Sequence, residues 1–306
     1  MKTLVLESTQ PFQGLPELVA LDEGLFEKEG LRVEFREREV GLERKTETHV
    51  TSPSGLNPFS SHGRLFEQGQ ADLYNACEWG NYCRVQETGV QSRHLGRRAI
   101  VAYAAIVVPP DSPVYTPQQL ANRLVGVPFY FGTHYVALHM LSGFLPREAI
   151  KICSAAPGSR YRLASLLRGD VEATTLTEPY VTLAEKKGCR ALCSTLFHGT
   201  EVGSERVDAE TYAAFNRAVR EAVRRINLNK RAYLRYFIEH HKNDPEIAAL
   251  SVDDLRESRL VVCDPAPIPL DEMQRTFDWL KSWGMLDATA SPFDLVNLEL
   301  QALAHP

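Results

Sequence analysis

Three side chains that could do chemistry are adjacent in the stretch ADLYNACEWG, where Cys77, Glu78 and Trp79 follow a short apolar run typical of a buried strand. The Glu78 carboxylate could accept hydrogen bonds from a ligand, or act as a general base if burial raises its pKa. The rings of Trp79 and Tyr82 could stack on a planar ligand. Cys77 could be a nucleophile only if nearby cations favoured its thiolate, and the apolar run before it argues against that.

The same order of features occurs twice in the chain. The stretches LFEQGQADLYNACEWG and LLRGDVEATTLTEPYV each run from a helix end through a glycine and a short strand to a glutamate, Glu78 or Glu178. Ligands of doubly wound sheets collect at the carboxyl ends of strands, so we expect both glutamates, and Tyr180 after the second, to face one site. Chance similarity, and a structural salt bridge from each glutamate to an arginine, are the alternatives.

A second group of candidates lies in FYFGTHYVALHML, between an expected strand and an expected helix. Backbone N–H groups at a helix start favour an anion, so Gly132 and Thr133 could hold the acidic group of a ligand. His134 and Tyr135 follow in the first turn, where His134 could move a proton and Tyr135 could contact the ligand. The alternatives are that Thr133 only caps the helix and that His134 is structural. In PGSRYRL, Arg160 could bind an acidic ligand or be an exposed residue at a helix start.

The segment 41–64 is long, polar and interrupted by glycine and proline, which predicts a functional lid or a surface loop. It contributes His49 and His62 as further candidates for proton transfer. Together with Glu78 and His134 they could suit zinc or ferrous iron, but no local spacing places two ligands on one helix face. We therefore predict no metal site.

Composition narrows the class of protein. The 306 residues carry a formal net charge of −5, which argues against nucleic acid as the partner. The densest basic stretch, RHLGRR at 93–98, is interpreted as a solvated connection. No run reaches the roughly 18 apolar residues of a membrane span. The six cysteines lie in separate expected elements, as expected for reduced thiols.

The alternation of short β-branched runs with longer amphipathic stretches predicts an α/β fold with mainly parallel strands. Expected strands are 3–7, 32–37, 71–76, 100–108, 124–128, 149–153, 173–176 and 190–196. Expected helices are 15–29, 116–122, 134–144, 160–168 and 180–187, with long helices over 209–240.

The chain resembles the type II periplasmic substrate-binding proteins, in particular their nitrate, sulfonate and thiamine-pyrimidine branch. The resemblance is carried by the order of LVALDEGLFEKEGLRVEF, FEQGQADL, VYTPQQLANRLVGVPFYFGTHYVALHML, LLRGDVEATTLTEPYVTLAEKKGCRAL and SERVDAETYAAFNRAVREAV. It implies two α/β lobes, residues 1–103 plus 199–306 and residues 104–198, joined by crossing strands near 102–107 and 192–198. A ligand would be held in the cleft between the lobes, and 77–79 would line its wall.

The same branch includes cytosolic enzymes, among them an aromatic sulfinate desulfinase. That enzyme has a nucleophilic cysteine in the loop after its first strand, where this chain has Ser8 and Thr9 in ESTQPFQG. The segment HVTSPSGLNPFSSHGRLF is similar to the enzyme's histidine-bearing segment. The cysteine-rich metal motif of the related pyrimidine-precursor synthase is absent from this sequence.

Two functions follow from the resemblance. The first is a transporter-type protein that binds one small planar acidic or heterocyclic molecule, with a permease as its partner if the chain is exported. The second is a cytosolic lyase, desulfinase- or decarboxylase-like, or a biosynthetic enzyme, in which His49, His62 or His134 moves a proton. Neither requires a cofactor. The expected compartment is cytoplasmic as written, or periplasmic if a signal peptide precedes this sequence, and the expected state is a monomer or weak dimer.

Overall fold

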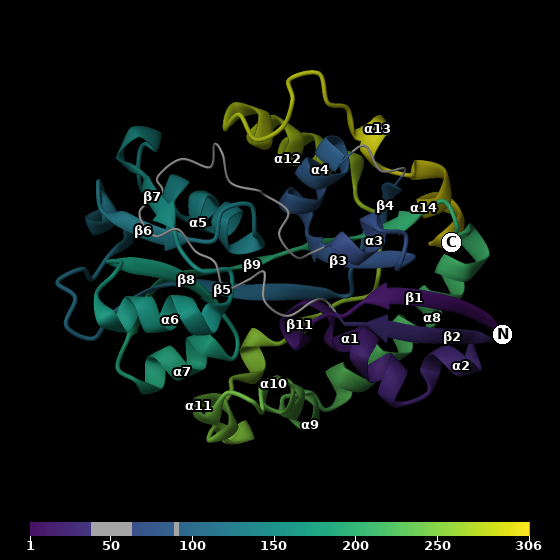
Figure 1. The fold of residues 1–306 in the computed structure, drawn as a ribbon, viewed down its shortest axis with the longest axis horizontal. Helices are drawn as coiled ribbons and strands as arrows, with labels where there is room; N and C mark the ends of the chain where they lie inside the picture. The colour runs from purple at the N-terminus through teal and green to yellow at the C-terminus, as the bar shows by residue number, and fades with distance from the viewer. Residues whose placement is uncertain (38–62, 89–91, 306) are drawn as a thin grey trace.

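The structure is a computed structural model that describes residues 1–37, 63–88 and 92–305 (Figure 1). Its first sheet has the strand order β2-β1-β3-β10-β4. The three strands β1, β2 and β3 are parallel, whereas β10 is antiparallel to both β3 and β4. The bounds are β1 Lys2–Glu7, β2 Leu31–Arg36, β3 Leu73–Cys77, β4 Ser92–Arg97 and β10 Gly199–Ser204.

The second sheet has the order β11-β5-β8-β6-β7, and its sixth strand, β9, also pairs with β5. Here β6, β7 and β8 are parallel, whereas β5 is antiparallel to β8, β9 and β11. The bounds are β5 Ile100–Val108, β6 Leu124–Val127, β7 Lys151–Ser154, β8 Ala173–Thr177, β9 Arg190–Phe197 and β11 Val261–Val262. The sequence therefore located the parallel strands of both sheets.

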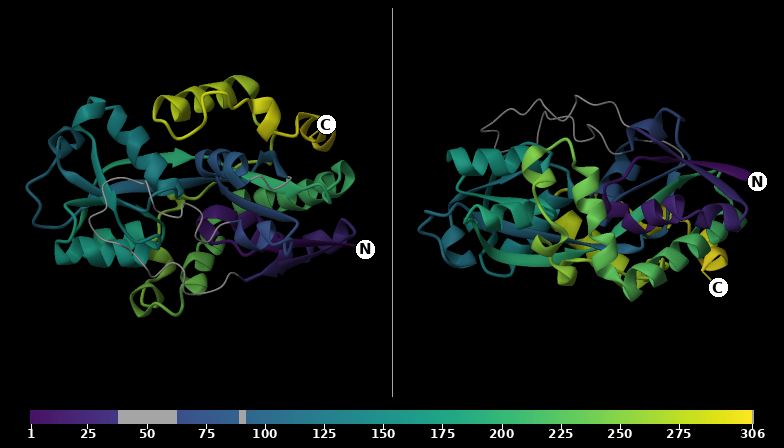
Figure 2. Two further views of the ribbon diagram at one scale, coloured as in Figure 1. Left: turned by 45° about the horizontal axis from the view of Figure 1, so that its top comes forward. Right: turned by 90° about the horizontal axis from the view of Figure 1, so that it is seen from below.

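Helices pack against both sheets, and α12 lies on the opposite side of the crossing strands from α9, α10 and α11 (Figures 1 and 2). The helices before residue 208 are α1 Pro11–Asp22, α2 Leu25–Lys28, α3 Arg64–Glu67, α4 Glu78–Thr88, α5 Gly132–Ser142, α6 Ser159–Arg168 and α7 Tyr180–Lys186. Those after it are α8 Ala209–Leu228, α9 Lys230–Tyr233, α10 Arg235–His240, α11 Pro245–Ala248, α12 Leu270–Ser282, α13 Pro292–Leu295 and α14 Leu298–Ala304. Among the described residues, no helix is long and apolar enough to cross a membrane.

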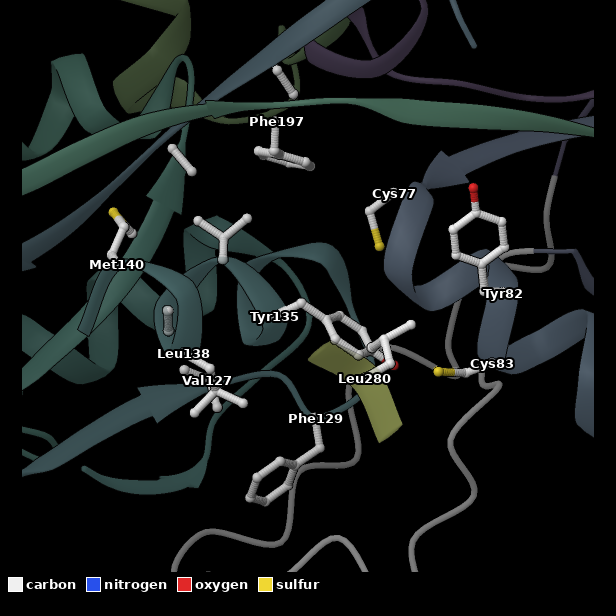
Figure 3. Close-up of a cluster of buried hydrophobic side chains, with 14 of the residues drawn as sticks. Cys77, Tyr82, Cys83, Val127, Phe129, Tyr135, Leu138, Met140, Phe197 and Leu280 are labelled. Carbon is white, nitrogen blue, oxygen red and sulfur yellow. The ribbon is translucent and has the colours of Figure 1, made fainter. Parts of the chain in front are cut away.

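Two short, adjacent connections carry the chain directly from a strand of one sheet to a strand of the other. The chain leaves β4 for β5 at residues 98–99 and returns from β9 to β10 through His198. These connections lie side by side because β5 and β9 pair from Ala102 opposite Phe197 onward. One apolar cluster spans both sides of the crossing, with Cys77 and Tyr82 meeting Val127, Tyr135 and Leu138 (Figure 3).

The interpretation of RHLGRR as a solvated connection was wrong. The stretch forms β4 and the first connection, and His94, Leu95 and Arg98 are fully or almost fully buried. The backbone is buried by pairing with β10, and the His94 imidazole Nδ1 hydrogen-bonds to Thr200 Oγ1 at 2.8 Å. Local composition could not show this, because the partners lie about a hundred residues away.

The single helix expected over 15–29 is two helices, α1 and α2. They are separated at Gly24, whose φ of 64° is left-handed and ends the regular helix. The repeated order of helix end, glycine, strand and glutamate is confirmed: Gly69 and Gly169 have φ of 70° and 80°, and Glu78 and Glu178 directly follow β3 and β8.

Candidate functional site

A cavity of about 250 Å³ lies where strands of both sheets end and five helices begin. The starts of α1 and α4 form one wall, and the starts of α5, α6 and α7 form the other. Six of the residues predicted from the sequence line this cavity together: Cys77, Gly132, Thr133, Arg160, Glu178 and Tyr180. The carboxyl ends of β3 and β8 therefore meet at one site, as the repeated pattern predicted.

The wall from the first sheet is built on the ends of β1 and β3. Gln10, Phe12 and Gln13 line the cavity from the start of α1, and the side chain of the N-cap residue Gln10 makes no capping hydrogen bond. From α4, the Asn81 amide Nδ2 donates to both the carbonyl and the hydroxyl oxygen of Thr200 at 3.1 Å. This anchors α4 to β10 and fixes the wall next to Cys77.

The wall from the second sheet presents two uncapped helix starts. Phe131 and Gly158 occupy the N-cap positions of α5 and α6, and neither helix start has a capping hydrogen bond from a side chain among the described residues. Their first-turn N–H groups, and the hydroxyls of Thr133 and Ser159, are therefore at the cavity. Thr133 lies inside the first turn of α5 and is not its cap.

A buried arginine shapes the turn that precedes α6. Arg162 donates from Nη1 to the Ala156 carbonyl at 2.8 Å and from Nε to the Thr175 carbonyl at 2.8 Å. Its Nη2 donates to Ser159 Oγ at 2.9 Å, and Ser159 Oγ in turn lies 3.2 Å from Thr177 Oγ1. The guanidinium thus joins the start of α6 to the end of β8 and orients the hydroxyls at the cavity.

Arg160 is held at the cavity by a residue that sequence reasoning did not identify. Asp244, which is buried at the start of α11, lies 3.2 Å from Arg160 Nε and accepts a hydrogen bond of 2.9 Å from the Tyr180 hydroxyl. His241 in the same segment also lines the cavity. No sequence signal pointed to this segment, because it reaches the cavity only through tertiary packing of α11 against α7.

The two glutamates at the strand ends are both engaged in ion pairs. Glu178 Oε1 lies 2.8 Å from Arg259 Nη1, and its carboxylate also accepts from the Thr182 N–H and hydroxyl. Glu78 Oε2 lies 3.6 Å from Arg97 Nη2. The structural salt bridge that was the alternative for both residues is thus present, and only Glu178 also lines the cavity.

Glu78, Trp79, Tyr82 and Tyr135 do not line the cavity but pack behind its wall. Burial raises the pKa of Glu78, while Arg97 and hydrogen bonds from Tyr82 and Thr276 act in the opposite direction. Trp79 stacks on Phe197 and Tyr135 with centroid distances of 5.8 and 6.3 Å. Figure 3 shows the Tyr135 ring directed toward Leu280 and Cys83.

His134 is also absent from the cavity lining and is 1% exposed. Burial lowers its pKa to about 3, so the ring is neutral at pH 7. The expectation that His134 and Tyr135 reach into the cleft is therefore corrected: the turn of α5 that exposes Thr133 directs the next two side chains into the core. His49 and His62 lie outside the described residues.

Cys77, which the sequence offered as a candidate nucleophile, lines the cavity. Its Sγ accepts a hydrogen bond from the Gly80 N–H at 3.3 Å. Burial nevertheless raises the pKa of Cys77 to about 11, which disfavours the thiolate. Within the described ranges, no group of three or more His, Cys, Asp or Glu could hold a metal ion.

Comparison with family models and with curated proteins finds no match. Solved structures do match along the chain. The alkanesulfonate-binding protein SsuA from Xanthomonas axonopodis pv. citri bound to MOPS has a TM-score of 0.71 at 15% identity, covering 100% of this chain and 98% of its own. For the aliphatic sulphonate binding protein SsuA from Escherichia coli the TM-score is 0.71 at 14% identity, with 99% of each chain covered. The desulfurization enzyme DszB has a TM-score of 0.63 at 15% identity, again over 99% of each chain.

The chain therefore has the two-lobe, type II periplasmic-binding-protein-like α/β fold, with a hinge and a cleft between the lobes. The fold expected from the sequence is confirmed. The lobe boundaries at 103, 104, 198 and 199 stay a prediction. At such low identity the likeness shows the fold, so the ligand must be argued from the cavity.

Proposed function

We propose that this protein binds one small acidic molecule in the cavity between its two sheets. The observation that carries the proposal is that the starts of α5 and α6 meet at one cavity, and that neither has a capping hydrogen bond from a side chain among the described residues. Such a helix start carries a partial positive charge, worth about 0.3–1 kcal/mol toward an anion. Helix α1 also starts at the cavity, but it begins with Pro11, which has no N–H. Arg160, which is paired with Asp244, places its guanidinium at the same cavity.

The aromatic lining supports a planar ligand. Phe12, Tyr130 and Phe131 line the cavity together with Tyr161, Tyr180 and Phe197. Aromatic rings stack favourably on flat ligands and bury their apolar faces. An aromatic sulfonate or carboxylate combines the two features, and sulfonates are also named for two of the structural neighbours. Delivery of such a ligand to a permease would be the transport form of this function.

A lyase reaction in the same cavity has less support from the described residues. The raised pKa of Cys77 disfavours a thiolate nucleophile, and His134 does not reach the cavity. A direct test is incubation with benzenesulfinate, followed by measurement of sulfite. Sulfite release that is lost in the Cys77→Ser variant would establish the enzyme in place of the binding protein.

Isothermal titration calorimetry with benzenesulfonate, benzoate and the neutral benzamide tests the binding proposal. We expect the two anions to bind and benzamide to bind at least about 10-fold more weakly, because the helix starts select charge. Arg160→Gln should weaken benzenesulfonate binding several-fold. The matched control is Arg168→Gln, an exposed arginine at the other end of α6, which should leave the Kd unchanged. Equal affinity for anions and benzamide, or no binding of any probe, would overturn the proposal.

A further inference from the structure

His241 lines the cavity from a segment that does not directly follow a strand of either sheet. It directly follows α10, and its ring stands edge-on to the Tyr180 ring, with centroids 5.5 Å apart and an interplanar angle of 84°. This packing holds the imidazole against the wall formed by the start of α7. The side chain is therefore positioned by two elements, α7 and α10.

The tautomer of His241 is determined by its own helix. Nδ1 lies 2.8 Å from the Phe237 carbonyl oxygen, and a carbonyl can only accept, so Nδ1 carries the hydrogen. In the neutral ring Nε2 is then an acceptor. Burial lowers the pKa of His241 to about 4, with His240 acting in the same direction and the Phe237 hydrogen bond and Asp244 opposing it. The ring is accordingly neutral at pH 7.

Two donors on side chains that line the same cavity bind Asp244. The Tyr180 hydroxyl and the Arg160 Nε are both directed to Asp244, at 2.9 and 3.2 Å. Among the described residues, no hydrogen bond to His241 Nε2 is formed, and this atom is not shielded from solvent in the way the orphaned Nε2 atoms of His94 and His134 are. Nε2 is thus an acceptor without a donor from the described residues, on a side chain that lines the cavity.

We propose that His241 Nε2 accepts a hydrogen bond from the ligand, and thereby selects acidic molecules that also carry an N–H or O–H donor away from the acidic group. This inference rests on the proposed function and adds a second recognition point to it. The helix starts and Arg160 bind the acidic group, whereas His241 accepts a hydrogen bond from a donor substituent elsewhere on the ligand. An ether or carbonyl oxygen opposite Nε2 would also be an acceptor, so no hydrogen bond could form. Ligands with such a group there are therefore disfavoured.

The experiment compares the 2-, 3- and 4-hydroxybenzenesulfonates with the matching methoxybenzenesulfonates by calorimetry. The methoxy probes retain the anion and the ring but lack the donor. In the unmodified protein we expect at least one hydroxy isomer to bind about 5- to 10-fold more tightly than its methoxy partner, the effect of one hydrogen bond. In His241→Phe that ratio should fall to about 1, whatever the change in the Kd of unsubstituted benzenesulfonate.

The exposed His240 supplies the matched control, because it is next to His241 but does not line the cavity. His240→Phe makes the same substitution there and should keep the preference. If His241→Phe does not fold, His241→Gln supplies an acceptor on a flexible stem and should keep part of the preference. The inference is overturned if no hydroxy isomer exceeds its methoxy partner, or if the preference persists in His241→Phe. Benzenesulfonate binding without any such preference overturns the inference alone, whereas failure of every probe overturns the proposed function with it.

Discussion

The His134 imidazole Nδ1 accepts a hydrogen bond of 3.1 Å from the backbone N–H of Tyr130. Tyr130 has a φ of 67°, a left-handed conformation that residues other than glycine seldom adopt. The hydrogen bond compensates the strain of this turn, and the turn leads directly into the start of α5 at the cavity. His134 therefore supports the turn before α5 from the side facing the core.

Replacement of His134 by alanine should lower the free energy of unfolding by about 1–3 kcal/mol, because the Tyr130 N–H loses its buried acceptor. It should also weaken benzenesulfonate binding, since the turn can relax. His134→Asn supplies a side-chain oxygen near the position of Nδ1 and should recover part of both effects. Urea denaturation and calorimetry measure them; equal losses in the two variants would contradict the positioning role.

A second prediction concerns the buried carboxyl pair Glu17 and Glu201, which lies between α1 and β10. Burial raises the pKa of Glu17 to about 7, partly offset by Arg98, Asn75 and a hydrogen bond with Glu201. Burial and Glu17 raise the pKa of Glu201, whose carboxyl accepts a hydrogen bond from the Tyr212 hydroxyl at 2.5 Å. One guanidinium, that of Arg98, faces two carboxyl groups, so the site is neutral when the pair holds one proton.

The folded state therefore binds a proton at Glu17 more tightly than the unfolded chain does. The resulting stability is fully present below a pH of about 4.5 and is lost as the pH rises through about 7. Between pH 5 and 8, the free energy of unfolding measured by urea denaturation should fall by up to about 3 kcal/mol more in the unmodified protein than in Glu17→Gln. The exposed Glu205→Gln should follow the unmodified protein. Parallel pH profiles for Glu17→Gln and the unmodified protein would refute this assignment.

A third prediction tests the ion pair of Glu178 and Arg259, whose side chains are 7% and 8% exposed. Arg259→Met leaves the Glu178 carboxylate buried without its cation and should destabilise the protein by about 3–5 kcal/mol. The double variant Glu178→Gln with Arg259→Met removes the uncompensated charge and should recover much of this loss. Thermal and urea unfolding measure both. A double variant no more stable than the single one would show that the Arg259 contacts to Glu185 and Tyr103 dominate instead.

A fourth prediction concerns the reactivity of Cys77. With a pKa of about 11, its thiolate fraction at pH 8 is about two orders of magnitude below that of an ordinary cysteine. Iodoacetamide should therefore label Cys77 at least about 100-fold more slowly than a cysteine-containing peptide, as followed by peptide mass spectrometry. Rapid labelling would show an activated thiol and would favour the lyase.

The sequence alone predicted the elements that depend on local rules. Apolar periodicity located the parallel strands, and the turn chemistry of Gly69 and Gly169 located the strand ends that carry Glu78 and Glu178. The helix was predicted to start at His134, two residues after its actual start at Gly132, and the fold followed from the order of these motifs along the chain. All of these signals lie within a few residues of the feature that they predict.

Tertiary structure decided which side chains reach the cavity. Helix α5 is buried on nearly every side, so its sequence has no apolar stripe that could show that Thr133 faces the cavity while His134 and Tyr135 face the core. Arg97 forms an ion pair with the distant Glu272, and His241 reaches the cavity through contacts with α7. Propensity and pattern act between near neighbours, whereas burial and ion pairing join residues far apart in the chain, and only the folded chain brings those together.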